Sequence, residues 1–174
     1  MGQVFDWSDG VFSELKQRDF ATVCTVPDGG LTQLLKRVSD DSDMQLVTLS
    51  TEEEGMGVVT GQWLGGQRSL LAIQSSGVGN CINALGFPAI MRAPCPMLVT
   101  MRGVWGEFNP WQVQMGMATQ QVLEAVGVKC FPVDQPEDVR ATFVGAVDLA
   151  LHGGFSTAVL ISQRVIGAKG FGQD

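Results

Sequence analysis

Three consecutive carboxylates, Glu52, Glu53 and Glu54, stand at the edge of a stretch that is almost free of charge. A carboxylate in dry surroundings can hold a proton or pass it to a neighbour, as a general acid or base does. The same residues also suit the start of a helix, because Thr51 as N-cap and Glu54 three residues later form a capping box. Acidic residues in a first turn also complement the helix dipole. Spacing alone favours the helix start over a catalytic carboxylate.

The stretch that follows, residues 55–106, contains no Asp, Glu or Lys, and its only charged residues are Arg68, Arg92 and Arg102. Three charged residues are too few for a stretch of this length to expose both faces of a sheet to water. The stretch therefore forms the centre of the core, or it also packs against another chain or subdomain, since charged residues are depleted at the centre of interfaces.

The segment 74–83, QSSGVGNCIN, combines polar residues with two closely spaced glycines and indicates a turn that leads into a helix. Backbone N–H groups at such a turn can bind an anion. A dinucleotide fingerprint would need a third glycine where Ile82 stands, and a P-loop would need a following lysine. A tight turn therefore explains the segment, and a stand-alone nucleotide-binding module is an alternative.

The remaining inventory excludes several kinds of chemistry. The chain has one histidine, His152, no tyrosine, and four cysteines without a CxxC pair, so we expect no metal site and buried structural cysteines. A formal net charge of −7, from 11 basic and 18 acidic residues, argues against nucleic-acid partners and anionic membrane surfaces. No apolar run reaches the ~20 residues of a membrane span, and residues 1–10 are not typical of a secretory signal. We therefore expect a cytoplasmic protein with reduced thiols.

The elements that must position these residues alternate along the chain. Six short runs rich in β-branched residues predict strands at 21–26, 45–49, 69–74, 97–102, 129–133 and 157–162. The segments between them have helical spacing, as in Val139, Phe143 and Val147. Continuously apolar strands separated by helices are typical of parallel strands buried on both faces. Residues 1–174 therefore predict a single α/β domain, doubly wound, with a six-stranded, mainly parallel sheet and helices on both faces.

In such a sheet, ligands bind beyond the carboxyl ends of the strands. Five loops follow these ends and are candidate binding loops: 27–30, 50–54, 75–80, 103–112 and the turn near Asp134. The acidic triplet and the glycine turn both belong to this set.

Four motifs, taken in order, resemble the pyrimidine-binding domain of thiamine diphosphate (ThDP) enzymes. They are TVPDGGL at 25–31, EEEGMGVVTGQWLGG at 52–66, QSSGVGNCINAL at 74–85 and RGVWGEFNPWQVQMGMAT at 102–119, and the third is the most specific. The resemblance extends over about residues 10–168 and is closest to the sulfopyruvate decarboxylases, through their alpha subunit, with the phosphonopyruvate decarboxylases next. It implies the doubly wound fold of that domain and the decarboxylation of a 2-oxoacid to an aldehyde and CO2.

The resemblance assigns roles residue by residue. ThDP enzymes place a glutamate nine residues before a glycine of the second motif, and in this chain Gly61 follows Glu52 by nine residues. Glu52 would then be the catalytic residue, through a hydrogen bond to N1′ of the cofactor's aminopyrimidine. The implied cofactor-binding residues are Glu52, Gln74, Ser76, Gly77 and Asn80. The implied substrate pocket consists of Pro27, Asp28, Ser75, Arg102 and Gln112.

The identity of the 2-oxoacid stays open at this point. Arg102 could balance an anionic group of the substrate, or it could form a buried ion pair. Trp105 and Trp111 flank the fourth motif and favour a 2-oxoacid that is bulkier and less anionic than sulfopyruvate. Structural roles, as a turn former or a helix cap, also remain open for Asp28, Ser76 and Asn80.

The chain lacks the other half of a ThDP site. That family holds the diphosphate and its Mg2+ through a second domain with a GDG motif, and no GDG occurs in this sequence. The resemblance therefore implies a split enzyme, in which this alpha subunit shares ThDP with a beta subunit whose GDG-type pyrophosphate-binding domain holds the Mg2+. The smallest expected assembly is α2β2. A non-catalytic or regulatory copy of the domain is the alternative.

Overall fold

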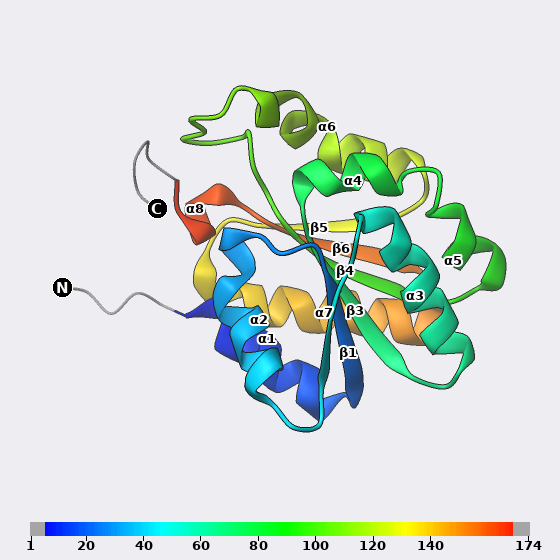
Figure 1. The fold of residues 1–174 in the computed structure, drawn as a ribbon. Helices are drawn as coiled ribbons and strands as arrows, with labels where there is room; N and C mark the ends of the chain where they lie inside the picture. The colour runs from blue at the N-terminus through cyan, green and yellow to red at the C-terminus, as the bar shows by residue number, and fades with distance from the viewer. Residues whose placement is uncertain (1–5, 169–174) are drawn as a thin grey trace.

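The computed structural model describes residues 6–168 and contains a six-stranded sheet. Its strands are β1 (Phe20–Thr25), β2 (Gln45–Thr48), β3 (Arg68–Gln74), β4 (Cys95–Thr100), β5 (Lys129–Val133) and β6 (Ser156–Ile161). They lie in the order β2-β1-β3-β4-β6-β5, and every neighbouring pair is parallel (Figure 1). The predicted doubly wound α/β fold is confirmed, and the sheet is wholly rather than mainly parallel.

The fourth strand differs most from its predicted range. It covers Cys95–Thr100, two residues earlier than the predicted 97–102. Cys95 and Pro96 pair with Ser156 and Thr157 of β6. Proline is unfavourable inside a strand because it has no N–H donor. The apolar pattern alone does not show that Pro96 nevertheless lies in β4, paired with Thr157 of β6.

Helices cover both faces of the sheet (Figure 1). One face carries α1 (Trp7–Gln17), α2 (Thr32–Asp40) and α7 (Val139–Gly153), and the other carries α3 (Glu52–Leu64), α4 (Ser75–Cys81), α5 (Gly86–Met91) and α6 (Trp111–Ala125). A short helix, α8 (Gln163–Ile166), follows β6 directly. Within residues 6–168, no helix is both long enough and apolar enough to cross a membrane.

Each face of the sheet has its own hydrophobic core. Successive residues of β3 alternate between them, so that Leu70 packs under α1, α2 and α7 while Leu71 packs under α3 to α6. The predicted stripe on α7, Val139, Phe143 and Val147, is fully buried in the first core. The sheet is thus covered on both sides, as its apolar strands predicted.

The loops after β1 and β3 leave the sheet toward opposite faces, since β1 is followed by α2 and β3 by α4. Because β1 and β3 are neighbours, their carboxyl ends form the switch point at which doubly wound folds bind ligands. Asp28 follows β1 and Gln74 ends β3, and the Gln74 side-chain amide donates to the Asp28 carboxylate at 2.6 Å. Two of the predicted site residues therefore meet at this point.

Two glycines hold α6 close to the end of β4. A Cβ added at Gly116 would overlap the carbonyl group of Arg102, and one added at Gly103 would overlap that of Gln112. Gly103 also has a φ of +78°, in the left-handed region that favours glycine. These glycines of the fourth motif therefore fix the 103–110 loop and the first turns of α6 beside the ligand edge.

We expect Gly116→Ala to destabilise the chain by about 1–3 kcal/mol, because its methyl group would overlap backbone that cannot move aside. Gly145→Ala on α7 is the matched control, since a Cβ there meets nothing within 4 Å. It should be neutral or stabilising by up to about 1 kcal/mol, as alanine is the better helix former. Urea unfolding measures both variants, and wild-type stability of Gly116→Ala would contradict the close approach.

Candidate active site

Glu52 is the first residue of α3, but its carboxylate takes no part in the helix cap. Thr51 Oγ1 accepts a hydrogen bond from the Glu53 N–H at 3.1 Å, and the Glu54 carboxylate accepts one from the Ser50 N–H at 2.7 Å. The predicted capping role therefore belongs to Thr51 and Glu54, although Glu54 bonds to residue 50 rather than to the N-cap residue itself. Glu52 is only 9% exposed.

The Glu52 side chain lies against α4. The Asn80 side-chain amide donates to its Oε2 at 2.8 Å. A Cβ added at Gly77 would overlap Cγ, Cδ and Oε1 of Glu52, so only glycine leaves room for the carboxylate. No Lys or Arg within residues 6–168 forms an ion pair with Glu52. A buried carboxylate held by a neutral amide can accept or share a proton.

The glycine turn of the third motif thus makes room for an anionic side chain of the same molecule. Gly77 lies against the Glu52 carboxylate, and Asn80 donates to it. A phosphate bound at this turn would be repelled by that carboxylate. The arrangement therefore disfavours the nucleotide-binding alternative for this segment.

A second network ties Asp28 to three strand ends. Its Oδ1 accepts from the Gln74 side-chain amide at 2.6 Å. Its Oδ2 accepts from the Gly30 N–H and from Thr100 Oγ1, both at 2.9 Å. Ser76 Oγ donates to Gln74 Oε1 at 2.6 Å. The hydrogen bonds from Asp28 through Gln74 to Ser76 join the turn after β1 to the end of β3 and the start of α4, and Thr100 adds the end of β4. The bond to Gly30 also gives Asp28 its turn-forming role.

Arg102 forms a buried ion pair with Glu107. Its Nε and Nη2 donate to the two carboxylate oxygens at 2.7 and 2.6 Å, and the two side chains are 9% and 4% exposed. Glu107 also accepts from the backbone N–H groups of Gly103 and Asn109 at 3.1 and 3.0 Å. The Arg102 guanidinium lowers the pKa of Glu107 to about 2. Of the two roles left open for Arg102, the structure contains the ion pair.

The other residues of the predicted substrate pocket lie in different surroundings. Ser75 is fully buried, and its hydroxyl accepts from the Arg102 N–H at 3.0 Å, which ties α4 to the end of β4. Pro27 is exposed. Gln112 Oε1 is buried and has no hydrogen-bond partner among the described residues. The structure therefore joins Ser75 and Arg102 directly, whereas the side-chain oxygen of Gln112 is buried without a hydrogen-bond donor among the described residues.

The predicted set omits two residues of this edge, Glu107 and Gln163. Gln163 is 1% exposed, accepts from the N–H groups of Val104 and Trp105 at 3.0 and 2.9 Å, and donates to Glu107 at 3.0 Å. Gln163 lies in α8, directly after β6. The five candidate loops did not include the segment after the sixth strand, and the rule that ligands bind beyond strand ends would have selected it there. No sequence pattern marks Glu107, because its role arises only when the loop folds back onto Arg102.

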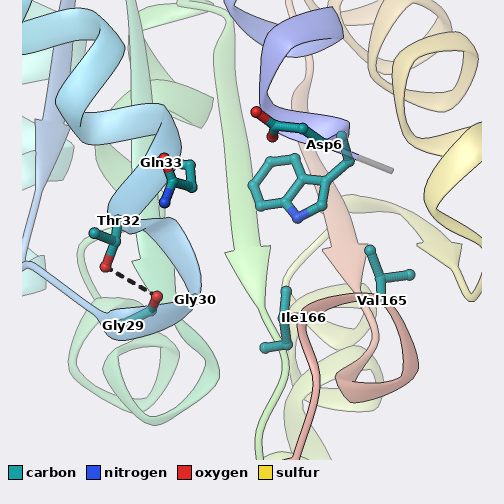
Figure 2. A pocket seen from close by; sticks show the side chains of 8 residues that line it. Asp6, Gly29, Gly30, Thr32, Gln33, Val165 and Ile166 are labelled. Carbon is teal, nitrogen blue, oxygen red and sulfur yellow. Dashed lines mark hydrogen bonds between the residues drawn. The ribbon is translucent and has the colours of Figure 1, made fainter. Parts of the chain in front are cut away.

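Two neighbouring cavities flank the turn after β1. The larger, of about 420 Å³, is lined by Asp6, Trp7, Gly29, Gly30, Thr32, Gln33, Val165 and Ile166. Figure 2 shows Thr32 and Gly29, joined by a hydrogen bond of 3.0 Å, across from Val165 and Ile166. A hollow of about 50 Å³ shares some of this lining and adds Asp28 and Arg102. Glu52 and Asn80 line neither cavity, and Asn80 is exposed beside Glu52.

Thiols and the single histidine have no catalytic setting in the described structure. Burial raises the pKa of Cys24 to about 11 and those of Cys81 and Cys95 to about 12, so these thiols stay protonated. His152 lies exposed in the last turn of α7. Within residues 6–168, no group of three or more His, Cys, Asp or Glu side chains could hold a metal ion.

Comparison with known proteins identifies the family. Over 155 residues, the chain is 32% identical to the alpha subunit of sulfopyruvate decarboxylase from Methanococcus maripaludis, and the match covers 88% of this chain and 93% of that subunit. The chain belongs to the sulfopyruvate decarboxylase alpha-subunit family. The resemblance that the four motifs indicated is thereby confirmed, although no protein-family model matches the sequence.

This chain is also similar to a part of two longer proteins. The sulfopyruvate decarboxylase of Methanosarcina acetivorans is 34% identical over 119 residues, which are 68% of this chain but only 30% of that protein. The 2-oxoglutarate:ferredoxin oxidoreductase of Magnetococcus marinus has a TM-score of 0.74 at 17% identity, covering 92% of this chain and 29% of its own. At such low identity the second likeness concerns the fold alone.

The low pKa of Glu107 predicts an acid-sensitive loop. In the unfolded chain this carboxyl group has its ordinary pKa of 4.5, and in the folded chain its pKa is about 2. The ion pair therefore stabilises the fold fully above pH 4.5 and loses a contribution on the order of 3 kcal/mol as the pH falls toward 2. Glu107→Gln should lower the free energy of unfolding at pH 7 and flatten its decline over this range. Urea unfolding at a series of pH values measures this, and curves parallel to the wild type would contradict it.

Proposed function

We propose that the chain is the alpha subunit of a split, ThDP-dependent 2-oxoacid decarboxylase, which releases an aldehyde and CO2 and is active only with a beta subunit. The observation that carries the proposal is the buried Glu52 carboxylate, which packs against Gly77, accepts from Asn80 and has no ion pair with a described residue. Membership of a decarboxylase subunit family supports the reaction class.

The surroundings of Glu52 fit an aminopyrimidine ring. A carboxylate can share a proton with a ring nitrogen only where neither water nor a cation competes for it. Glu52 is 9% exposed, and its hydrogen-bond donor is a neutral amide on Oε2. Its Oε1 accepts no hydrogen bond from the described residues and lies where Gly77 has no side chain. Gln74 and Ser76 complete the proposed cofactor-binding set with Gly77 and Asn80.

Bound ThDP would supply an electron sink for the electron pair that is released when the bond to CO2 breaks. The contribution of this chain is narrower. Glu52 holds or shares a proton at N1′ of the aminopyrimidine, and Asn80 orients the carboxylate for that contact. The nearly charge-free stretch after Glu52 surrounds the contact with apolar groups and keeps it dry.

The substrate side of the proposed site is the Asp28 network and its neighbours. The network spans the ends of β1, β3 and β4, at the switch point of the sheet. Its carboxylate, amide and hydroxyl groups can orient the carboxylate and keto oxygen of a 2-oxoacid directly or through water. The proposed pocket consists of Pro27, Asp28, Ser75, Arg102 and Gln112.

We propose that a beta subunit holds the other end of the cofactor. This sequence has no GDG motif, so the GDG-type domain of the partner would bind the diphosphate and Mg2+, with α2β2 as the smallest assembly. A relative named as an alpha subunit supports a separate partner. The longer Methanosarcina relative, of which the match covers 30%, has the length to carry such a domain in the same chain.

The face formed by α3 to α6 has the features of a subunit contact. Large apolar side chains are exposed there, among them Ile90 at 81%, Trp111 at 82% and Met117 at 64%. Contiguous exposed apolar surface and few charges are typical of interfaces. Glu52 and Asn80 belong to α3 and α4 of the same face. A beta subunit docked there would also cover the open side of the Glu52 site.

Replacing Glu52 tests the proposed proton contact. Glu52→Gln keeps the shape of the side chain but cannot share a proton in the same way, so CO2 release by the assembled enzyme should fall by roughly 100-fold or more. Glu53→Gln is the matched control, because Glu53 is the exposed neighbour in the same helical turn and should leave activity unchanged. Near-normal activity of folded Glu52→Gln, verified by circular dichroism, would remove Glu52 from the mechanism.

A charge placed on the apolar face tests the subunit contact. Ile90→Asp would put an unpaired carboxylate into the proposed interface and should weaken binding of the beta subunit by about tenfold or more. Leu149→Asp is the control, since Leu149 is partly exposed on α7 across the sheet and should leave binding unchanged. Titration of tagged beta subunit measures both affinities, and equal affinity for the two variants would place the contact elsewhere.

A further inference from the structure

Arg164 is the one basic residue at the ligand edge, among residues 6–168, that has no acidic partner. It follows the carboxyl end of β6 as the second residue of α8, and its side chain is exposed. None of the ion pairs within the described part of the chain includes it. Arg102, at the end of the neighbouring strand β4, is instead paired with both oxygens of Glu107. Within the described residues, the positive charge of Arg164 is therefore not neutralised.

Two contacts fix the position of Arg164. Its backbone N–H donates to Ser162 Oγ at 3.0 Å, which caps the start of α8. Its guanidinium lies over the ring of Trp105, 5.4 Å from the centroid. Gln163 accepts from the N–H groups of Val104 and Trp105, so the loop that carries the tryptophan is bound to α8 itself. A cation that is already held over an aromatic face loses less conformational freedom when it binds a ligand.

Trp105 therefore has a role other than contact with a bulky substrate. An indole ring attracts a guanidinium through its electron-rich face and leaves the N–H groups at the edge of the guanidinium free to donate. The tryptophan after β4 supports a cation at the ligand edge, and its presence in the fourth motif does not by itself indicate an uncharged substrate.

The helix that carries Arg164 forms one wall of the proposed substrate pocket. α8 lies between the start of α2 and the loop 103–110 (Figure 1). Ile166, in the same helical turn as Arg164, lines the small hollow together with Asp28 and Arg102. Residues two apart in a helix have Cα atoms only about 5 Å apart, and an arginine side chain is long enough to span that separation. Arg164 therefore lies at the border of this hollow.

The other charges of the hollow show why a substrate with two anionic groups would need such a cation. The Asp28 carboxylate has only neutral hydrogen-bond donors among the described residues. The charges of Arg102 and Glu107 cancel each other. A 2-oxoacid brings one carboxylate of its own, and a second anionic group would add to the repulsion from Asp28. Among the described residues, Arg164 is the group that could offset this repulsion.

We infer that Arg164 determines substrate specificity by binding a second anionic group of the 2-oxoacid, such as a sulfonate, at the border of the proposed pocket. The inference rests on the proposed function. The planar guanidinium can donate two parallel hydrogen bonds to the oxygens of such a group, as it does to carboxylate and phosphate. Because the second anionic group takes no part in the bond that breaks, its contact stabilises the bound substrate and the transition state alike. Arg164 should therefore act mainly on KM.

Two substrates that differ in one group test the inference on the assembled enzyme, that is, this chain co-expressed with its beta subunit and supplied with ThDP and Mg2+. Sulfopyruvate carries a sulfonate where 2-oxobutanoate has a methyl group. Arg164→Met removes the charge and should lower kcat/KM for sulfopyruvate by about tenfold or more, mainly through KM. It should change kcat/KM for 2-oxobutanoate by less than about twofold. Arg164→Lys should lower kcat/KM for sulfopyruvate less than Arg164→Met does, because the charge remains and only the planar donor pair is lost.

Lys129→Met is the matched control. Lys129 is exposed at the amino end of β5, and its ammonium group lies over the Phe155 ring, 5.9 Å from the centroid. The variant removes the same charge and the same kind of contact at the opposite edge of the sheet, so kcat/KM for both acids should stay unchanged. Lys169 lies outside the described residues, and Lys169→Met is compared in the same assay. A loss for sulfopyruvate in Lys169→Met but not in Arg164→Met would overturn the inference.

Melting temperatures establish that the variants are folded before their kinetics are compared. Equal relative changes for the two acids in folded Arg164→Met would overturn the inference and leave the decarboxylase proposal standing. So would a wild-type enzyme that releases CO2 from 2-oxobutanoate but not from sulfopyruvate. Release of CO2 from neither acid would overturn both. If Arg164→Met does not fold, the salt dependence of the wild type decides. Added NaCl should lower kcat/KM for sulfopyruvate more than for 2-oxobutanoate, because an exposed cation is screened, and equal changes would overturn the inference.

Discussion

The Glu52 carboxylate occupies the volume that a side chain at position 77 would fill. The burial and the orientation of this carboxylate both depend on the close contact between α3 and α4 at this point. Burial of the carboxylate among few charged residues costs free energy of desolvation, and the hydrogen bond from the Asn80 side-chain amide offsets part of that cost and orients the group. A lysine or arginine in contact with it would make a stronger pair but would lock the carboxylate in its ionised form. No Lys or Arg among residues 6–168 pairs with Glu52, and under the proposed function this leaves the carboxylate able to share a proton with the cofactor.

Two carboxylates elsewhere at the ligand edge, those of Asp28 and Glu107, have their hydrogen-bond donors within the described residues. Asp28 accepts from the ends of β3 and β4 and from the N–H of Gly30 in its own turn, and Glu107 accepts from Arg102, the loop backbone and Gln163. The edge is consequently rigid in its polar framework and largely apolar on its exposed surface. Under the proposed function, such a surface would contact the beta subunit through shape and burial more than through charge.

The sequence was sufficient to predict the architecture, because the strands are apolar on both sides and the helices have regular spacing. The resemblance also selected Glu52, Gln74, Ser76 and Asn80, whose hydrogen-bonding groups the structure brings into two compact networks. Contacts that depend on distant segments were not accessible in this way. Gln163 donates a hydrogen bond to Glu107, which lies 56 residues earlier in the sequence, and no sequence pattern around either residue predicts this contact. The predicted start of β4, at residue 97, was wrong for a related reason. Pairing with β6 brings Cys95 and Pro96 into the strand, and this pairing outweighs the low strand preference of proline.

The hydrogen bonds to Glu107 and Gln163 also limit the motion of the loop from residue 103 to 110. The loop from residue 103 to 110 is held by Arg102 through Glu107 and by Gln163 of α8 through Val104, Trp105 and Glu107, and these hydrogen bonds need no ligand. Conformational entropy of this loop is therefore lost once, during folding, and not again in each catalytic cycle. Under the proposed function, a substrate would therefore meet a loop whose backbone is already ordered, and a change of substrate would require replacement of side chains and not movement of the backbone.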